Sequence, residues 1–567
     1  MKRGKIALLW MALAMTCTTT ADELPHISIT ADTALNAQKK VPAHMKTDDY
    51  DGSIGIKLRG NSSLSFNQKK YTIELRNEQG DDIDAPLLGM PTHSDWVLLA
   101  PYNDVSTVRD PLAFQLWRDM GHWGPRTKMV EVTFNGDYRG IYILSEAIKR
   151  GPERVDISKL KKTDIAGRDV TGGYLLRIDT YNADDATFPS KVPGIGDGIM
   201  TSQITWSCIY PKKSKLQPEQ LQYIEAFVDT VEQTIQADYF ADPQRGYARY
   251  IDVPSFVDYF IHSELSLNAD GYKRSAYFYK EKLHADGTGG KLVAGPVWDY
   301  NLAYGNCNFC NANKIDAWCF EGGNTQPTPA LWQRLLQDPN FRKAVKQRYQ
   351  QLRKGALSNR AIFGYIDRHA RLLAPHLAKH FEKYPELLVS EEQKKQAAQQ
   401  PAFGGFGQMP FGGFPMPQFD SIPQFDFSRF PMPRFDSIPQ FPGGFPMMPG
   451  GFQMPEGGFQ MPEGGFQMPE GGFQMPEGGF QMPEGGFAGF GGFGGGGDMI
   501  GWFAAYRVSS YDEEIATLKQ WLADRLAFLD QQIARFDRDF EPRIQEPKEI
   551  KGPSFGGFNF NFQFPQQ

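Results

Sequence analysis

Residues 268–279 read Asn268-Ala-Asp-Gly-Tyr-Lys-Arg-Ser-Ala-Tyr-Phe-Tyr279, and residues 291–301 read Lys291-Leu-Val-Ala-Gly-Pro-Val-Trp-Asp-Tyr-Asn301. Each stretch contains a short aromatic or aliphatic run typical of a β-strand, and a glycine-rich turn begins at Asp286 between them. This pattern predicts a β-hairpin. The loops that enter and leave a hairpin meet at its open end. The sequence therefore predicts that Asp270 and Asp299 lie close together.

Two carboxylates in one neighbourhood fit a site of phosphoryl transfer. In such sites one aspartate accepts the proton of the attacking hydroxyl, and a second aspartate, just after a hairpin, holds the metal on the nucleotide phosphates. The alternative is structural, because aspartates are common in loops: Asp270 would end a helix in a turn and Asp299 would cap a loop. Spacing alone leaves both interpretations open.

Composition and the N-terminal residues bear on location and partners. The chain has 567 residues and a net charge of −6, which gives no reason to expect nucleic acid or an anionic membrane as the main partner. Residues 1–21 are typical of a secretory signal peptide, with basic residues before an apolar run from Ile6 to Met15. No later stretch is apolar enough for a transmembrane segment. We therefore expect an exported protein that is periplasmic, on the cell surface or extracellular.

Four cysteines follow the predicted signal peptide: Cys208, Cys307, Cys310 and Cys319. An even number in an exported chain indicates disulfides, so we expect two that staple the loop after Asp299. The sequence does not give their pairing. The alternative is part of a zinc site, although the usual second close-spaced pair of ligands is missing.

The remaining pattern predicts an α+β protein with two lobes. Before residue 180 most segments alternate as antiparallel strands do, including Lys69–Leu75, Val130–Phe134 and Gly173–Asp179, with one helix at 107–120. Helical periodicity follows at 219–236, 252–265 and 340–399. We expect an antiparallel sheet as the first lobe and helices as the second. Lys69 shares a strand face with Tyr71 and Ile73. If that face is the inner one, Lys69 would point into a cleft while Lys70 points to water.

Residues 401–497 differ from the rest of the chain. The unit Gly-Gly-Phe-Gln-Met-Pro-Glu repeats in tandem from Gly450 to Glu484. Glycine and proline at this density predict a disordered insertion. Its Phe and Met residues could mediate self-association, and the alternative is a repeat expanded by slippage and tolerated in a surface loop. Residues 498–546 predict a long helix with a capping box at Ser510-Tyr-Asp-Glu513, and residues 547–567 a disordered tail.

As an ordered set, several motifs resemble the CotH family, named for a spore-coat protein H and comprising secreted or surface kinases. The resemblance covers about residues 26–400 and 498–541, and places a CotH-like kinase domain at 22–400. The motifs are Arg59-Gly-Asn-Ser-Ser63, Lys69 two residues before Tyr71, Gly140-Ile-Tyr-Ile-Leu-Ser-Glu146, Asn268-Ala-Asp270, and Gly295-Pro-Val-Trp-Asp-Tyr-Asn301. The resemblance implies an atypical two-lobed protein-kinase-like fold that uses ATP with Mg²⁺ or Mn²⁺.

The resemblance also implies a role for each site residue. Asp270 would be the catalytic base and Asp299 a metal ligand. Lys69 would bind the nucleotide phosphates, Glu146 would lie at the nucleotide cleft, and the turn Arg59, Gly60, Asn61, Ser62 and Ser63 would cover the phosphates. Ser275 stands where the spore-coat members have a metal-binding asparagine, and Asn301 where many members have a second aspartate. Both changes weaken the predicted ligand set.

These expectations lead to one principal function and two alternatives. The principal one is an exported kinase that transfers the γ-phosphoryl group of ATP to Ser or Thr of secreted or surface proteins. The first alternative is a non-catalytic surface binding or assembly protein, similar to an adhesin. The second is a phosphotransferase that acts on a sugar or another small molecule.

Overall fold

The structure is a computed structural model that describes residues 23–180, 182, 184–196, 203–322, 327–394 and 504–541. The predicted signal peptide at 1–21, the repeats at 401–497 and the tail at 547–567 lie outside these ranges. None of the helices within these ranges has the length and apolar composition that a membrane span needs.

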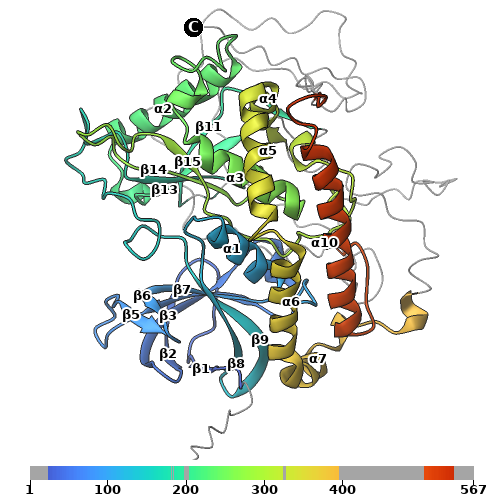
Figure 1. Cartoon of the computed structure of the whole chain (residues 1–567). Helices are drawn as coiled ribbons and strands as arrows, with labels where there is room; N and C mark the ends of the chain where they lie inside the picture. Colours follow the sequence, from blue (N-terminus) through green and yellow to red (C-terminus); the bar gives the residue numbers. More distant parts are fainter. Residues whose placement is uncertain are drawn as a thin grey trace, which may run out of the picture. The chain divides into compact units, whose positions relative to one another are not determined.

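The N-terminal strands form a closed seven-stranded β-barrel in the order β1-β2-β3-β4-β7-β9-β8 (Figure 1). The strands are β1 (His26–Thr30), β2 (Val41–Lys46), β3 (Asp51–Arg59), β4 (Lys70–Leu75), β7 (Asp95–Leu99), β8 (Thr127–Phe134) and β9 (Asp137–Glu146). Neighbouring strands are antiparallel except β1 and β8, which run parallel with Ile27 opposite Val132. This last pairing closes the sheet, so every barrel strand has a neighbour on both sides.

The prediction of a two-lobed, kinase-like fold with an antiparallel sheet as its first lobe is therefore wrong. The chain is a mixed α/β protein whose first sheet is a mixed barrel. The strand predicted at 173–179 also belongs elsewhere, since β10 (Tyr174–Ile178) pairs with strands of a second sheet. Strand signals in a sequence are local, whereas the β1–β8 contact joins residues far apart in the chain.

Side chains of the barrel alternate between its interior and an outer face. The interior is a cluster of buried apolar residues that includes Ile29, Ile56, Ile73, Leu98 and Leu144. On β7, β8 and β9 the residues of opposite parity are also buried, because they pack against helix α1 (Arg109–Asp119) in a second core: Val97, Leu99, Met129, Ile141 and Ile143. These strands are thus apolar on both faces, and α1 is fixed against the outside of the barrel.

The second sheet has five strands in the order β11-β13-β10-β14-β15. Its other strands are β11 (Ala186–Pro189), β13 (Thr205–Tyr210), β14 (Ala276–Lys280) and β15 (Leu292–Ala294). The predicted hairpin is confirmed: β14 and β15 are antiparallel, with Phe278 opposite Ala294. Two smaller two-stranded sheets join β5 (Ala85–Leu87) to β6 (Met90–His93) and β12 (Gly194–Ile195) to β16 (Thr328–Pro329).

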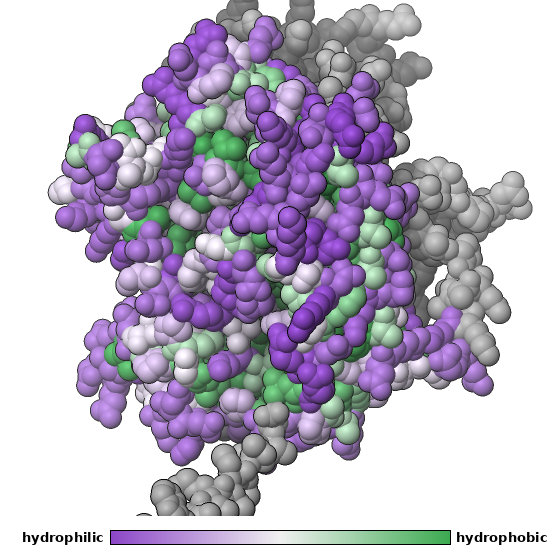
Figure 2. All heavy atoms as spheres, viewed as in Figure 1, coloured by the Kyte–Doolittle hydropathy of each residue, from purple (hydrophilic) through white to green (hydrophobic). Residues whose placement is uncertain are grey.

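The predicted helices at 107–120, 219–236 and 252–265 are confirmed as α1, α2 and α3. Besides α1, the helices are α2 (Pro218–Gln236), α3 (Val253–Ser266), α4 (Leu331–Gln337), α5 (Pro339–Arg353), α6 (Asn359–Leu373), α7 (Leu377–Lys383) and α10 (Tyr511–Ile533). Figure 2 shows that polar side chains dominate one face, with apolar side chains visible mainly between elements.

Helix α10 follows the repeats in sequence and packs on α3, α5 and α6 (Figure 1). Its start is capped as predicted, since Glu513 N donates to Ser510 Oγ at 3.1 Å. Its apolar stripe is fully buried, and the Arg525 guanidinium donates to the Glu264 carbonyl of α3 at 2.9 Å. Residues 504–541 are thus part of the same packed unit as the preceding helices.

Three histidines on helices are buried: His262, His369 and His380. Burial lowers the pKa of each to about 4, because the charged imidazolium loses its hydration. His369 Nε2 lies 2.9 Å from Thr107 Oγ1, in the loop that leads into α1. These side chains are part of the core, and packing explains them without a metal.

We predict that His369 makes the fold sensitive to mild acid. An unfolded histidine has a pKa near 6.5 and binds a proton below it, whereas folded His369 stays neutral down to about 4. The free energy of unfolding should therefore fall as the pH drops from about 6.5 towards 4. His369→Gln should reduce this loss by about 1 kcal/mol between pH 6.5 and 5.5, measured by urea unfolding. His44→Gln is the control because that side chain is 53% exposed, and an equal effect in both variants would contradict the prediction.

Candidate active site

Strand β4, helix α1 and the segment after β15 bring an ion pair and a second acidic residue together. Lys70 starts β4, Asp110 lies in the first turn of α1, and Asp299 follows β15. Lys70 Nζ lies 3.7 Å from Asp299 Oδ1, and the amide of Tyr300 donates to Asp110 Oδ1 at 2.6 Å. Asp299 adopts a positive φ of 66°, which is strained for a residue with a side chain. Contacts on both sides of Asp299 hold it in this conformation.

The loop that carries Asp270 is joined directly to the loop that carries Asp299. The Asn268 side chain does this, because its Nδ2 donates to the Asp299 carbonyl at 3.0 Å and its Oδ1 accepts from Asp270 N at 3.3 Å. Arg274 lies four residues further along this loop, with a nitrogen 3.8 Å from Asp270 Oδ1. The prediction that the two aspartates share one neighbourhood is confirmed by these contacts.

Burial and mutual repulsion shape the charges of the site. The pKa of Asp110 is raised to about 7: burial is the largest cause, the charge of Asp299 adds to it, and Lys70 opposes both. Burial likewise raises the pKa of Asp270, and Arg274 opposes this effect. Carboxylates held close together in a low-dielectric environment favour a cation between them. The site is therefore suited to positively charged or metal-bound ligands.

The turn between β3 and β4 lies beside these acids. The Arg59 guanidinium stacks over the Trp298 ring at 5.0 Å, next to Asp299 in sequence. Gly60 has a φ of 118°, and a Cβ added there would lie 1.9 Å from Ser63 Oγ, so the turn closes only around a glycine. Asn61 Nδ2 donates to Thr180 Oγ1 at 3.2 Å, at the end of β10. Residues 59–63 thus form one wall of the site.

The structure places the two neighbouring lysines differently from the prediction. The face that Lys69 was expected to share with Tyr71 and Ile73 is the apolar interior of the barrel. Lys70 lies on the opposite face, is 8% exposed and reaches Asp299. Lys69 precedes β4 and donates to the Leu64 carbonyl at 2.6 Å. The expectation that Lys70 points to water is wrong, because its side chain is buried and its ammonium faces Asp299.

Glu146, Ser275 and Asn301 have separate surroundings. Glu146 is fully buried at the end of β9, and Arg126 and Arg154 bind its carboxylate. Ser275 directly precedes β14 and has a φ of 46°. Asn301 Nδ2 donates to Asn103 Oδ1 at 2.7 Å, and the Asn301 carbonyl accepts from Asn306. Ser275 and Asn301 therefore lie in the two aspartate loops, whereas Glu146 belongs to an arginine cluster.

Sequence reasoning missed Lys70, Asp110 and Asp179. Two weak signals mark the aspartates: Asp110 is an acidic residue in the first turn of a helix, and Asp179 directly follows an apolar strand. Burial raises the pKa of Asp179, Arg177 opposes this effect, and the charge of Asp299 adds to it. The negative charge of Asp299 therefore acts on the Asp179 carboxylate.

Neither predicted disulfide is present, since Cys208, Cys307 and Cys319 are buried thiols. Cys208 lies on β13, away from the loop that it was expected to staple. Cys319 Sγ packs behind the Asp270 loop, 3.6 Å from the Asn268 carbonyl and 2.6 Å from where a Cβ on Gly271 would lie. Within the described ranges, no three side chains of His, Cys, Asp or Glu gather as metal ligands, so a protein-only zinc site gains no support.

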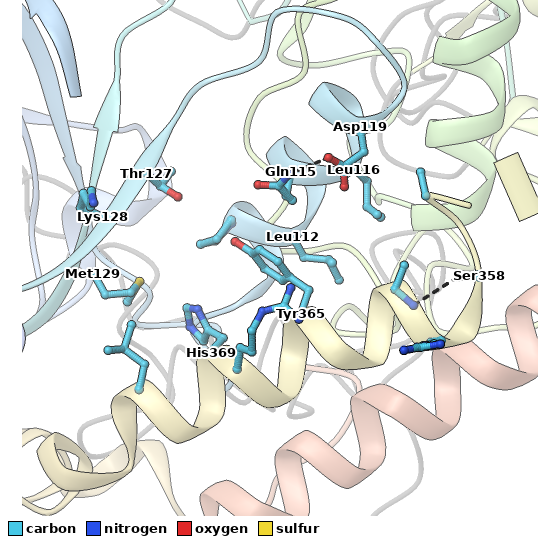
Figure 3. A pocket seen from close by; sticks show the side chains of 16 residues that line it. Leu112, Gln115, Leu116, Asp119, Thr127, Lys128, Met129, Ser358, Tyr365 and His369 are labelled. Carbon is cyan, nitrogen blue, oxygen red and sulfur yellow. Dashed lines mark hydrogen bonds between the residues drawn. The ribbon is translucent and has the colours of Figure 1, made fainter. Parts of the chain in front are cut away.

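A pocket of about 670 Å³ lies on the other side of α1, between this helix, β8 and α6 (Figure 3). Leu112, Leu116, Met129 and Tyr365 line it, but none of the site aspartates does. It is therefore distinct from the site described above.

Comparison with known proteins agrees with these motifs. The family described as CotH kinase protein matches residues 56–401. A similar protein is the inner spore coat protein H of Bacillus subtilis (strain 168), which is 22% identical over 307 residues, 54% of this chain and 73% of that protein. The family match spans the β3–β4 turn, Lys70, Asp110 and both aspartate loops. The chain belongs to the CotH family.

Proposed function

We propose that the chain is an exported protein kinase that transfers the γ-phosphoryl group of ATP to serine or threonine hydroxyls of secreted or surface proteins. The observation that carries this proposal is the junction of the two aspartate loops through Asn268, with Lys70 beside Asp299. Membership of a family described as CotH kinase protein supports it. Export is supported by the signal-like residues 1–21 and by the coat-protein name of the relative.

The donor set fits Mg²⁺ or Mn²⁺ bound with ATP. Mg²⁺ prefers oxygen ligands, and next to a nucleotide it takes one or two protein carboxylates together with phosphate oxygens. Asp299 would hold the ion, since its side chain is 36% exposed, and Asn301 and Ser275 offer further oxygen atoms in the adjoining loops. The bound ion would neutralise phosphate charge.

The chain's own residues would position the reactants. Asp270 would orient the attacking hydroxyl and accept its proton, a task for which burial suits it by raising its pKa above that of an exposed aspartate. Lys70 would take the phosphate contact expected of Lys69. The Arg59–Ser63 turn would cover the phosphates, while Glu146 would stabilise the fold through its two arginines.

A non-catalytic binding or assembly protein is the second candidate. The observation that favours it is the name of the relative, which describes a coat protein. Such a protein would keep the fold and the buried ion pairs but would show no change in melting temperature with ATP and metal.

One prediction from the proposed function concerns phosphoryl transfer. The chain with residues 1–21 removed should transfer labelled γ-phosphate from ATP to protein in the presence of Mg²⁺ or Mn²⁺. Asp270→Ala and Asp299→Ala should each reduce the rate by about 100-fold or more, because each removes a group that acts on the reacting atoms. Asp119→Ala is the control, since that exposed carboxylate lines the pocket on the other side of α1. Release of phosphate without labelled protein would indicate a small-molecule acceptor, and no transfer at all would favour the binding protein.

The second prediction separates the two lysines. Lys70→Ala should weaken metal-dependent ATP binding by about tenfold or more, the loss expected for a contact between a charged donor and phosphate. Lys69→Ala should change it less than threefold, because that ammonium is bound to the Leu64 carbonyl. Titration calorimetry of both variants measures this difference. A larger effect at Lys69 would show that the nucleotide site lies elsewhere.

A further inference from the structure

Asp179 and Ser275 come together at the edge of the site through strand pairing. Strands β10 and β14 are antiparallel, and their last paired residues towards the site are Ile178 and Ala276. Asp179 directly follows β10 and Ser275 directly precedes β14, so both adjoin this end of the sheet. The Asp179 side chain is 15% exposed. The loop that follows Asp179 and the loop that ends at Ser275 therefore meet the sheet at the same end.

Two further contacts direct Asp179 towards the site. Its Oδ1 accepts from Thr180 N at 2.7 Å, and Thr180 in turn accepts from Asn61 of the β3–β4 turn. The charge of Asp179 also raises the pKa of Asp270, and the charge of Asp299 raises that of Asp179. The same turn reaches the other loop, because Arg59 stacks over the ring of Trp298, next to Asp299 in sequence. The β3–β4 turn thus links the Asp179 end of β10 to the Asp299 loop.

The positive charge beside Asp179 is shared with another acid. A nitrogen of Arg177 lies 3.4 Å from Asp179 Oδ2, while another lies 2.6 Å from Asp185 Oδ2. The closer contact is to Asp185, so the single guanidinium leaves part of the charge of Asp179 available to a cation. Asp185 has the same partner and gives a matched comparison.

We propose that Asp179 supplies an oxygen ligand to the divalent cation that accompanies ATP, an inference that rests on the function proposed above. Ser275, at the start of β14, offers only a neutral hydroxyl, whereas Mg²⁺ and Mn²⁺ bind carboxylate oxygens much more strongly. Asp179 and Asp299 then provide the two protein carboxylates that such an ion takes beside a nucleotide. Asp179 would thus provide the carboxylate oxygen that Ser275 cannot provide.

The test compares Asp179→Asn with Asp185→Asn in the chain that lacks residues 1–21. Each variant removes one carboxylate from Arg177, so each should perturb the fold to a similar degree. The measurement is the Mn²⁺ concentration that gives half of the rise in melting temperature caused by a non-hydrolysable ATP analogue. Asp179→Asn should raise this concentration by about tenfold or more, and Asp185→Asn by less than twofold.

A second variant distinguishes a ligand from a structural role. Ser275→Asn places an amide oxygen opposite Asp179 and should restore at least half of the Mn²⁺ affinity, on a logarithmic scale, to the Asp179→Asn chain. A purely structural loss at Asp179 would not be repaired from the other strand. Rescue therefore supports the ligand role, and failure of rescue overturns it.

The outcomes separate this inference from the function on which it rests. Suppose that the wild-type chain binds the analogue only with Mn²⁺, and that Asp179→Asn and Asp185→Asn raise the half-maximal Mn²⁺ concentration equally. This result would overturn the role of Asp179 and leave the proposed kinase intact. Absence of any Mn²⁺-dependent binding by the wild-type chain would overturn both.

Discussion

The packing of helix α1 against the outer face of the barrel is the constraint on which the site depends. Strand β4 alternates, so Ile73 and Leu75 fill the barrel while Lys70 points to the side on which α1 lies. Helix α1 presents Asp110 to the Tyr300 amide, next to Asp299. If the barrel were an open sheet, β4 would have less to fix its register, and a slip of one residue would exchange Lys69 for Lys70.

The segment after the repeats supports the same helix from behind. Arg109, the residue before Asp110, is fully buried and donates to Glu514 of α10 at 2.6 Å and to the Ala303 carbonyl at 3.1 Å. Trp521 packs over Gly305, where a Cβ would lie 2.6 Å from its ring. The loop after Asp299 is therefore held between α1 and α10. Breaking a buried ion pair of this kind leaves an uncompensated charge, which makes the network costly to disrupt.

The site combines carboxylates that repel one another with cations placed at its edge. Asp110, Asp179 and Asp270 all have raised pKa values because they are buried near other acids, and Lys70, Arg177 and Arg274 offset only part of that effect. This balance suits a ligand that brings its own positive charge. A nucleotide with a divalent cation has this property, whereas an anion alone would add to the repulsion.

Local signals in the sequence determined the hairpin, several helices and the loops of Asp270 and Asp299. Alternation, turn residues and caps act over a few residues, so Phe278, Ala294 and Ser510 carried enough information for these elements. The motifs in these segments also carried the resemblance to the CotH family. The even number of cysteines predicted disulfides, but all four are thiols in the structure. Cys208 lies on β13, which β10 separates from the β14–β15 hairpin that leads to the loop after Asp299.

Tertiary structure alone decided the closure of the barrel and the membership of the site. The parallel contact of β1 with β8 has no local signal, yet it turns one face of β4 into a core, while Lys70 on the other face reaches Asp299. Asp110 and Asp179 reach the site only because α1 packs on the barrel and β10 pairs with β14. A single sequence specifies which residues alternate, but the side that faces the cleft depends on what packs against it.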